Sequence, residues 1–380
     1  MKVLVVSHTY IAPVNRDKWK ALALNYSDVT LKVVFPTRWP GNLMQHESGD
    51  LGPENLPKCE FIALDGFNFG NEMTYGYYPV NLFKLLKNFR PDIIHVEQGD
   101  NALSYFQLIL IAKLLRLKSK FLFFTWINWK HNFSWKYRLL WKRIENFNIR
   151  ASSGAIAGNL EAKNILRDKN FKKPVLVLPQ LGVNELKFCP VKQCKRQIKT
   201  VCFIGRIIPE KGVFLLLNAF AELIPEFKDW KLLFVGRGPS LIELKNIVAK
   251  LTLSSYVEFR NPVSHDEIAN VLSGVDILVL PSYDTPEWKE QFGHVLIEAM
   301  ACRVAVIGSD AGEILNVISG SGIVFEQNNK ESLKDKLREL MFDEQLRSSI
   351  AQTGYELALK RYTHDAIAQK TCDFWREFGG

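Results

Sequence analysis

Hydrophobic residues fall along this chain in short runs that alternate with longer amphipathic stretches. The short runs are rich in valine, isoleucine and phenylalanine, which is typical of buried strands. They predict strands over residues 3–7, 29–35, 93–96, 120–125, 154–157 and 175–178. Intervening stretches, among them residues 101–116 and 135–150, repeat with a helical period. Alternating strands and helices predict βαβ units around a parallel sheet.

A second alternating series follows a linker, residues 179–200, that contains two prolines and two cysteines. Strands are predicted over residues 200–204, 231–235, 256–259, 276–280 and 304–307. Helices are predicted over residues 212–223, 241–251, 265–272, 293–302, 330–341, 344–358 and 363–378. The fold class is therefore α/β, with two doubly wound domains in tandem. Such domains bind ligands at the carboxyl ends of their strands.

Composition fits this picture, with 380 residues, 47% of them hydrophobic and 23% charged. No apolar run reaches the ~18 residues that span a bilayer, and the apolar start reads as a strand and not as a signal peptide. We therefore expect a cytoplasmic protein. The six cysteines form no C-x-x-C pair, which favours reduced, buried thiols. The net charge of +9 favours anionic partners such as nucleotides, phospholipids or nucleic acid.

Three strand-to-helix segments could bind a ligand. In the first, Gly205 allows a close backbone approach, and Arg206 and Lys211 bring two cations to a helix N-terminus, which suits a diphosphate. Solvated surface charges are the alternative reading. At a second turn, around Gly236, the backbone could approach a nucleotide closely. Any tight βα turn followed by a proline at the start of the helix has the same sequence pattern, however.

The third segment runs from Glu290 to Glu298. Gly293 opens a helix there, so the amides of residues 292–295 lack intrahelical partners. Glu298 lies inside an otherwise apolar helix and needs a hydrogen-bond partner, which the hydroxyls of a ribose would supply. A capped helix with a surface glutamate is the alternative.

Together these segments resemble glycosyltransferase family 4, retaining enzymes of the GT-B fold. The matching residues are Phe203–Gly212, Phe234–Pro239, Val275–Ser282, Glu290–Ala301 and Ser309–Glu313. Glu290 and Glu298 correspond to the E-x7-E signature of that family. The resemblance is strong over residues 200–325 and looser before them.

The resemblance implies a role for each residue of these segments. Arg206 and Lys211 would hold the donor diphosphate, and Glu290 would face the transferred sugar. Glu298 would hold the ribose, and the backbone near Arg260 would meet the base. The other expected donor contacts are Gly205, Gly236, Phe292, Gly293, His294 and Val295. No cofactor or metal is expected, because the chain has no D-x-D pair and the two cations would replace the ion. The base, UDP or GDP type, stays open.

The resemblance also implies the domain organisation. Residues 1–182 would be a Rossmann-like acceptor domain and residues 183–360 would be a Rossmann-like domain that binds the nucleotide-sugar donor. The two would face each other, and a last helix over residues 361–380 would cross back to the first. The acceptor would be a saccharide or a lipid-linked sugar, as in the biosynthesis of surface polysaccharides or glycolipids.

Three positions depart from the family pattern. The loop after the first strand lacks the usual glycine pair, and Arg16 could reach the phosphates instead. The family's cleft histidine is missing near residues 124–128, where Asn128 could contact acceptor or phosphate. Arg303 stands where the family prefers glycine, and a non-glycine residue in a left-handed cap costs roughly 1–2 kcal/mol.

Residues 126–150 interleave seven aromatic with six basic residues. That composition suits an anionic membrane interface, and we hypothesise peripheral binding to the inner face of the membrane. A helix packed in the first domain is the alternative. Nothing in the chain resembles a nucleic-acid module, so no nucleic acid is expected as a partner.

Other functions stay open at this stage. A GT-B nucleotide-sugar epimerase would share the architecture but need no acceptor. A non-catalytic nucleotide-sugar-binding protein is disfavoured by the intact set of Arg206, Lys211, Glu290 and Glu298. A nicotinamide dehydrogenase is disfavoured because no G-x-G-x-x-G follows the first strand.

Overall fold

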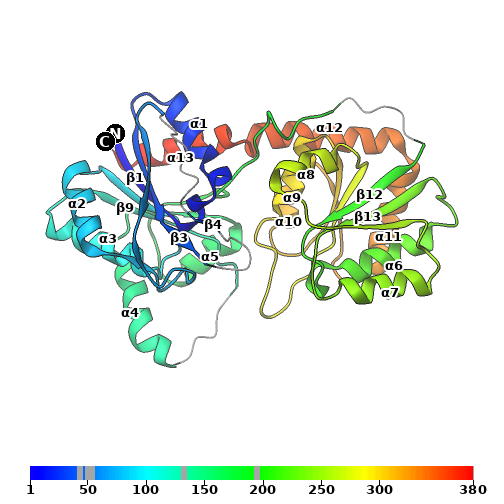
Figure 1. Ribbon diagram of the computed structural model, residues 1–380, viewed down its shortest axis with the longest axis horizontal. Helices are drawn as coiled ribbons and strands as arrows, with labels where there is room; N and C mark the ends of the chain where they lie inside the picture. Colours follow the sequence, from blue (N-terminus) through cyan, green and yellow to red (C-terminus); the bar gives the residue numbers. More distant parts are fainter. Residues whose placement is uncertain (41–45, 48–55, 130–134, 192–196, 380) are drawn as a thin grey trace. The chain divides into compact units, whose positions relative to one another are not determined.

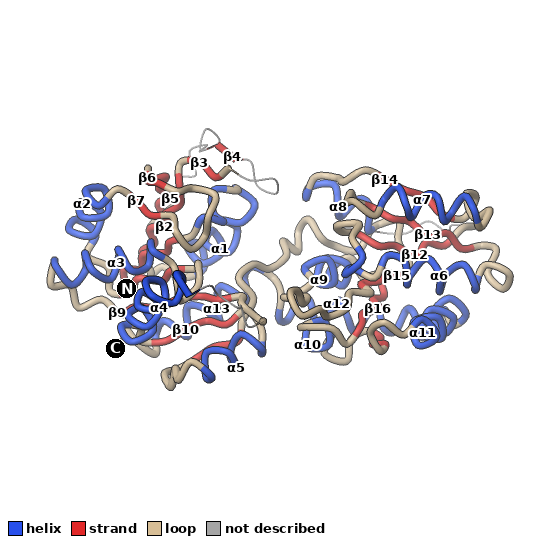
Figure 2. The backbone as a smooth tube through the Cα atoms, turned by 90° about the horizontal axis from the view of Figure 1, so that it is seen from below, coloured by secondary structure: helices blue, strands red, loops and turns tan. Residues whose placement is uncertain are grey.

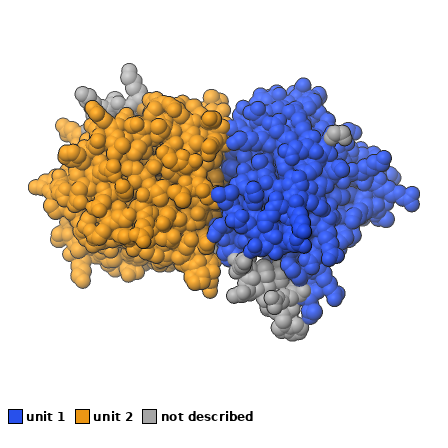
Figure 3. Space-filling model, turned by 180° about the vertical axis from the view of Figure 1, so that it is seen from behind, with its two compact units in different colours: residues 1–181, 364–380 blue, residues 182–363 orange. Residues whose placement is uncertain are grey.

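The computed structural model describes residues 1–40, 46–47, 56–129, 135–191 and 197–379. The chain forms two compact units (Figure 1). Residues 1–181 and 364–380 make up the first unit and residues 182–363 the second, and Figure 3 colours them separately. Each unit is an α/β domain built on one main parallel sheet.

The first unit has a parallel sheet in the order β11-β10-β9-β8-β1-β2-β5, as far as the chain is described. Its strands are β1 (Lys2–Val6), β2 (Thr30–Pro36), β5 (Cys59–Leu64), β8 (Ile93–Val96), β9 (Lys120–Thr125), β10 (Gly154–Ala157) and β11 (Val175–Val177). Two short antiparallel pairs lie beyond the carboxyl edge: β3 (Arg38–Trp39) with β4 (His46–Glu47), and β6 (Gly66–Phe67) with β7 (Gly76–Tyr77).

Helices surround this sheet (Figure 2). They are α1 (Asp17–Asn25), α2 (Pro79–Phe89), α3 (Leu103–Leu114), α4 (Trp135–Ala151), α5 (Leu160–Asp168) and α13 (His364–Arg376). The last of these is the C-terminal helix, and it packs against α1. The rings of Trp19 and Trp375 stack there with centroids 5.6 Å apart. The expected return of the C-terminal helix to the first domain is therefore confirmed.

The second unit has a parallel sheet in the order β14-β13-β12-β15-β16-β17 within the described residues. Its strands are β12 (Lys199–Ile204), β13 (Trp230–Val235), β14 (Val257–Arg260), β15 (Ile277–Leu280), β16 (Ala305–Ser309) and β17 (Ile323–Phe325). Its helices are α6 (Val213–Leu223), α7 (Leu241–Lys250), α8 (His265–Leu272), α9 (His294–Ala301), α10 (Ile314–Ile318), α11 (Lys330–Phe342) and α12 (Glu344–Arg361).

Both faces of this second sheet are covered, which explains why its strands are continuous apolar runs. Alternate residues such as Val201 and Phe203 pack in a core with α6, α7 and α11. The residues between them, such as Cys202 and Leu278, are also fully buried. The doubly wound α/β class predicted from the sequence is confirmed in both units.

Local sequence signals set the ends of several helices. Asn159, Asn329 and Asp343 cap α5, α11 and α12, and each side chain accepts a hydrogen bond from an amide of the first turn. Arg303 follows α9 with a φ of 57°, so the expected left-handed residue at this position is confirmed.

The predicted strands and helices are present within three residues of their predicted bounds. The strands β5 and β17 of the main sheets and the four short strands β3, β4, β6 and β7 were not predicted. Cys59, Cys202, Cys302 and Cys372 are buried, Cys189 is exposed, and Cys194 lies outside the described residues. Among the described helices, none is both long and apolar enough to cross a membrane.

Candidate functional site

Two glycine turns meet at the carboxyl edge of the sheet in the second unit. Gly205 follows β12 and Gly236 follows β13. A Cβ atom on Gly236 would lie only 1.9 Å from the Gly205 carbonyl oxygen, so the two loops touch through their backbones. Gly212 has a left-handed backbone conformation, and a Cβ atom on it would likewise lie 1.9 Å from the carbonyl oxygen of Pro281, the residue after β15. These contacts admit only glycine and bring the backbones of the loops together at this edge.

Lys211, Ser282 and Glu290 converge at the same edge from three separate segments. The Nζ atom of Lys211 lies 2.5 Å from Oε2 of Glu290, and the Ser282 hydroxyl donates to the same oxygen at 3.0 Å. Glu290 is only 8% exposed, and a buried carboxylate needs polar partners such as these. The backbone carbonyl of Glu290 accepts a hydrogen bond from the amide of Glu313 at 3.1 Å, which holds the Glu290 loop against the segment after β16.

Two further side chains complete the cationic part of this edge. The Lys211 ammonium lies over the ring of Trp288, 5.1 Å from its centroid, which holds the lysine stem in place. Arg206 is exposed, and within the described residues its side chain makes no hydrogen bond or ion pair. In this loop the Lys211 side chain is therefore held by its neighbours, whereas the Arg206 side chain is exposed to solvent.

Helix α9 begins beside this cluster. Gly293 caps it with a φ of 83°, and its first turn contains the amides of His294 and Val295, which precede the regular hydrogen bonds of the helix. The Phe292 ring is buried against His294 and Tyr362, with centroids 4.9 and 5.7 Å away. The helix start is thus a rigid group of amide donors, which favours an anion or a polar ligand.

Glu298 is buried one turn into α9 and is paired with a histidine from a neighbouring helix. Nε2 of His265, the first residue of α8, lies 3.1 Å from Oε1 of Glu298. The ring of His265 packs edge-on against Phe188. Arg260, at the end of β14, is exposed and pairs with Glu258 at 2.6 Å. The predicted residues of the second unit therefore share one edge of its sheet.

The two site residues expected in the first unit are both buried. The Arg16 guanidinium donates to the carbonyls of Tyr10 and Ile11 at 2.7 and 3.1 Å and lies over the Phe35 ring. Arg16 thereby holds the glycine-free loop in two short 3-10 turns (His8–Ile11 and Pro13–Arg16). The structure does not favour the expectation that Arg16 reaches a phosphate. Asn128 is 2% exposed.

A buried polar cluster supports the carboxyl edge of the first sheet. Glu97 follows β8 and pairs with Lys18 at 2.9 Å, and it accepts hydrogen bonds from Tyr10 and from Gln180. Burial alone would raise the pKa of Glu97, but the Lys18 ammonium and the hydrogen bonds outweigh burial and hold it below its usual value. The ion pair anchors the loop after β1.

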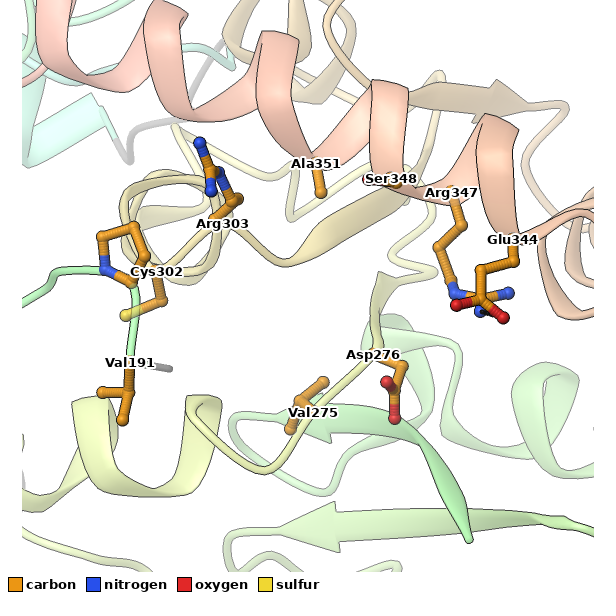
Figure 4. A pocket seen from close by; sticks show the side chains of 10 residues that line it. Val191, Val275, Asp276, Cys302, Arg303, Glu344, Arg347, Ser348 and Ala351 are labelled. Atoms are coloured by element: carbon orange, nitrogen blue, oxygen red, sulfur yellow. Dashed lines mark ion pairs between the residues drawn. The ribbon is translucent and has the colours of Figure 1, made fainter. Parts of the chain in front are cut away.

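A pocket of about 500 Å³ lies at the opposite, amino edge of the second sheet (Figure 4). Asp276 precedes β15, Arg303 precedes β16, and Arg347 lies on α12. Asp276 also accepts the amide of Thr200 at 2.8 Å. This pocket is therefore remote from the residues at the carboxyl edge, and we do not assign it to their chemistry.

Three side chains at the carboxyl edge were not selected from the sequence: Ser282, His265 and Trp288. Ser282 contacts Glu290, His265 contacts Glu298 and Trp288 contacts Lys211. These contacts form only when the chain folds. The position of Ser282 directly after a buried strand was the one signal that could have identified it.

Comparison with known proteins agrees with this geometry. Residues 191–357 match the family described as Glycosyl transferases group 1, so this segment is a domain of that kind. An uncharacterized glycosyltransferase of Methanocaldococcus jannaschii is 34% identical over 160 residues, which cover 42% of each chain. Alpha-D-kanosaminyltransferase of Streptomyces kanamyceticus is 28% identical over 181 residues, 47% of this chain and 46% of the relative. The chain spans less than half the length of these relatives in the matched regions.

Similarity at the level of the fold extends further. A glycosyltransferase from Rickettsia africae superposes with a TM-score of 0.72 over 99% of this chain and 98% of its own, at 18% identity. The two Rossmann-like units therefore belong to the GT-B fold.

Proposed function

We propose that this protein is a retaining glycosyltransferase that transfers a sugar from a nucleotide-diphosphate sugar to a saccharide or lipid-linked acceptor. The observation that carries the proposal is the convergence of Lys211, Ser282 and Glu290 beside the start of α9. The glycosyl transferases group 1 domain contains all of these residues, which supports the same conclusion.

The donor would bind across the carboxyl edge of the second sheet. The exposed Arg206 and the remaining hydrogens of the Lys211 ammonium would face the diphosphate. Glu290 and the first amides of α9 would face the sugar hydroxyls. Glu298 would accept hydrogen bonds from the ribose. Because two cations are available, we propose that no divalent ion is required at the phosphates.

The chemistry follows from the charges that develop as the donor breaks. Cleavage of the bond between the anomeric carbon and the diphosphate oxygen leaves negative charge on the phosphate and positive charge on the sugar ring. Fixed cations at the phosphate stabilise this state more than the ground state. The acceptor oxygen would then bond to the anomeric carbon from the same face, and its proton would pass to a diphosphate oxygen. Configuration is thereby retained without a protein nucleophile.

We further propose a role in the synthesis of a surface polysaccharide or glycolipid. The name of the Streptomyces relative, a kanosaminyltransferase, supports transfer of a sugar rather than its isomerisation. An epimerase would interconvert donors in the absence of an acceptor. A transferase would hydrolyse the donor slowly and release nucleotide faster when acceptor is added.

The proposed donor class can be tested by thermal shift with a panel of nucleoside diphosphates. Stabilisation grows with occupancy, so the preferred base should raise the melting temperature most. The variant Glu298→Gln should lose most of that stabilisation. Equal, negligible shifts for all nucleotides would contradict the proposal.

A further inference from the structure

The net charge of the chain is concentrated in one segment of the first unit. Residues 101–153 contain ten Lys and Arg residues and a single acidic residue, Glu145, a net of +9. This equals the net charge of the whole chain, so the other residues are balanced. The segment covers α3, β9 and α4. Six of the ten cations lie on α3 and α4, and this local concentration of charge indicates an anionic partner.

The single acidic residue does not offset these cations at the surface. Glu145 is buried on the inner side of α4, where Lys142 and Lys169 contact its carboxylate at 2.7 and 2.5 Å. Two lysines thus already neutralise it. Lys113, Lys118, Arg143 and Arg150 have no acidic partner within the described residues.

The outward side of α4 is a mixed basic and apolar stripe. Leu139, Arg143, Asn146 and Arg150 follow one another at helical spacing, and all four are exposed. Leu139 is 57% exposed, and Leu140 next to it is 59% exposed. Positions 144, 145, 148 and 149 of the same helix are buried against the unit. The side chains of residues 130–138 lie outside the described structure.

Helix α3 continues this surface. The Lys113 ammonium lies 4.8 Å from the centroid of the Phe147 ring, and Phe106 packs against the same ring, so the two helices are in contact (Figures 1 and 2). Leu110 and Leu114, on the outer side of α3, are 43% and 73% exposed. The combined surface therefore presents four leucines among uncompensated cations.

We propose that this surface of α3 and α4 docks on a membrane containing anionic lipids. The cations would contact the headgroups, and the leucines would enter the boundary between headgroups and acyl chains. A polyanion such as nucleic acid would use the cations but would gain nothing from the exposed leucines. The docking surface goes beyond the proposed sugar transfer and would bring the first unit to a lipid-linked acceptor.

Vesicle flotation with the full chain tests the proposal. The protein should float with phosphatidylcholine vesicles that contain phosphatidylglycerol, but not with pure phosphatidylcholine, and high salt should release it. The triple variant Lys113→Gln, Arg143→Gln, Arg150→Gln should bind on the order of a hundredfold more weakly, because each cation contributes roughly a factor of five. Its control is Lys228→Gln, Lys250→Gln, Lys360→Gln in the second unit, which removes the same charge from exposed sites.

The apolar contribution is tested separately. Leu139→Ser with Leu140→Ser should weaken vesicle binding about tenfold or more, whereas Ile242→Ser, at a 74% exposed position of α7, should not. Absence of flotation at low salt, or an equal loss in the control variants, would overturn the proposal. The proposal would also be overturned if the protein bound heparin or single-stranded DNA more tightly than vesicles and the leucine variants left that binding unchanged. Nucleotide-induced thermal stabilisation, measured on the same proteins, reports on the second unit and separates failure of the docking surface from failure of the proposed function.

Discussion

At the scale of single residues, Lys211 and Glu290 depend on one another. The two residues are distant in sequence, yet their charged atoms lie 2.5 Å apart at a site where Glu290 is nearly buried. The ammonium group has three hydrogens, so it can hold the glutamate and still offer donors to a phosphate. Arg206 has no such partner among the described residues and remains available for the second phosphate.

Removing either cation should slow transfer. We expect Lys211→Ala and Arg206→Ala each to raise the barrier by ~2–4 kcal/mol, by analogy with loss of one oxyanion donor. Lys228→Ala, at an exposed site of the second unit, is the control. Initial rates at saturating donor measure the effect, and near wild-type rates in both variants would remove these residues from the mechanism.

The two glutamates of the α9 segment should separate binding from turnover. Glu290→Gln should lower the turnover number more than nucleotide affinity, because Glu290 is placed toward the transferred sugar. Glu298→Gln should weaken nucleoside diphosphate binding by roughly ten- to a hundredfold, because a charge-assisted hydrogen bond contributes about 1.5–3 kcal/mol. Calorimetric titration and kinetics on both variants check this. Poor nucleotide binding with normal turnover in Glu290→Gln would reverse the assignment.

The sequence identified residues whose spacing is itself a signal, such as Glu290 and Glu298. It did not identify Ser282, His265 or Trp288, because their contacts join separate elements. The burial of Arg16 could not be predicted either. A cation in a loop is usually solvated, and only the fold supplies the two carbonyls and the aromatic ring that surround this one.

At the scale of elements, continuous apolar runs gave the central strands of both sheets because those strands are covered on both faces. In the two main sheets the missed strands were β5 and β17, which are two of the four edge strands; the other two, β11 and β14, were predicted. The side chains of β5 and β17 are mostly half-buried, so the apolar run is interrupted or short. The hydrophobic pattern of the sequence reflects how deeply a strand is buried by its neighbours. That burial is lower at the edges of a sheet than at its centre.

Gly212 should be indispensable to the loop that carries Lys211. Alanine there would have a strained φ of 67° and a Cβ atom 1.9 Å from the Pro281 carbonyl oxygen. Gly320 has a similar φ of 79° but open space around its missing Cβ, so it reports strain alone. We expect Gly320→Ala to cost about 1 kcal/mol and Gly212→Ala to cost clearly more and to abolish nucleotide binding. Equal unfolding midpoints for the two variants would contradict the close contact.

At the scale of the whole molecule, a buried histidine should make stability depend on pH. His95, fully buried on β8, lies 4.0 Å from Glu97 and edge-on to the Trp375 ring. Burial lowers its pKa from 6.5 to about 4, although Glu97 acts in the opposite sense. Between these values the unfolded chain binds a proton that the native chain does not, so stability falls as the pH falls from about 6.5 to about 4.

The expected loss between pH 7 and pH 5 is about 2 kcal/mol. His95→Phe lacks the titrating group and should lose that much less. Chemical denaturation of both proteins at the two pH values, followed by tryptophan fluorescence, gives the difference. Identical pH dependence in the two proteins would show that the pKa of His95 is the same in the native and the unfolded chain, which would contradict the effect of burial.

The balance of charge is also a property of the whole molecule, and the sequence analysis singled out residues 126–150 within the basic segment 101–153. The sequence could not show which of these cations are paired with an acidic group. The structure shows that the Glu145 carboxylate lies on the inner side of α4 and contacts Lys142 and Lys169.

Sugar transfer from a nucleotide donor is tested most directly by the rate of nucleoside diphosphate release from its preferred nucleotide sugar, with and without acceptor. We predict slow release alone, a marked acceleration by a saccharide or lipid-linked acceptor, and loss of that acceleration in Glu290→Gln. Conversion of the donor to an epimer without acceptor, or release that is unchanged in Glu290→Gln, would contradict it.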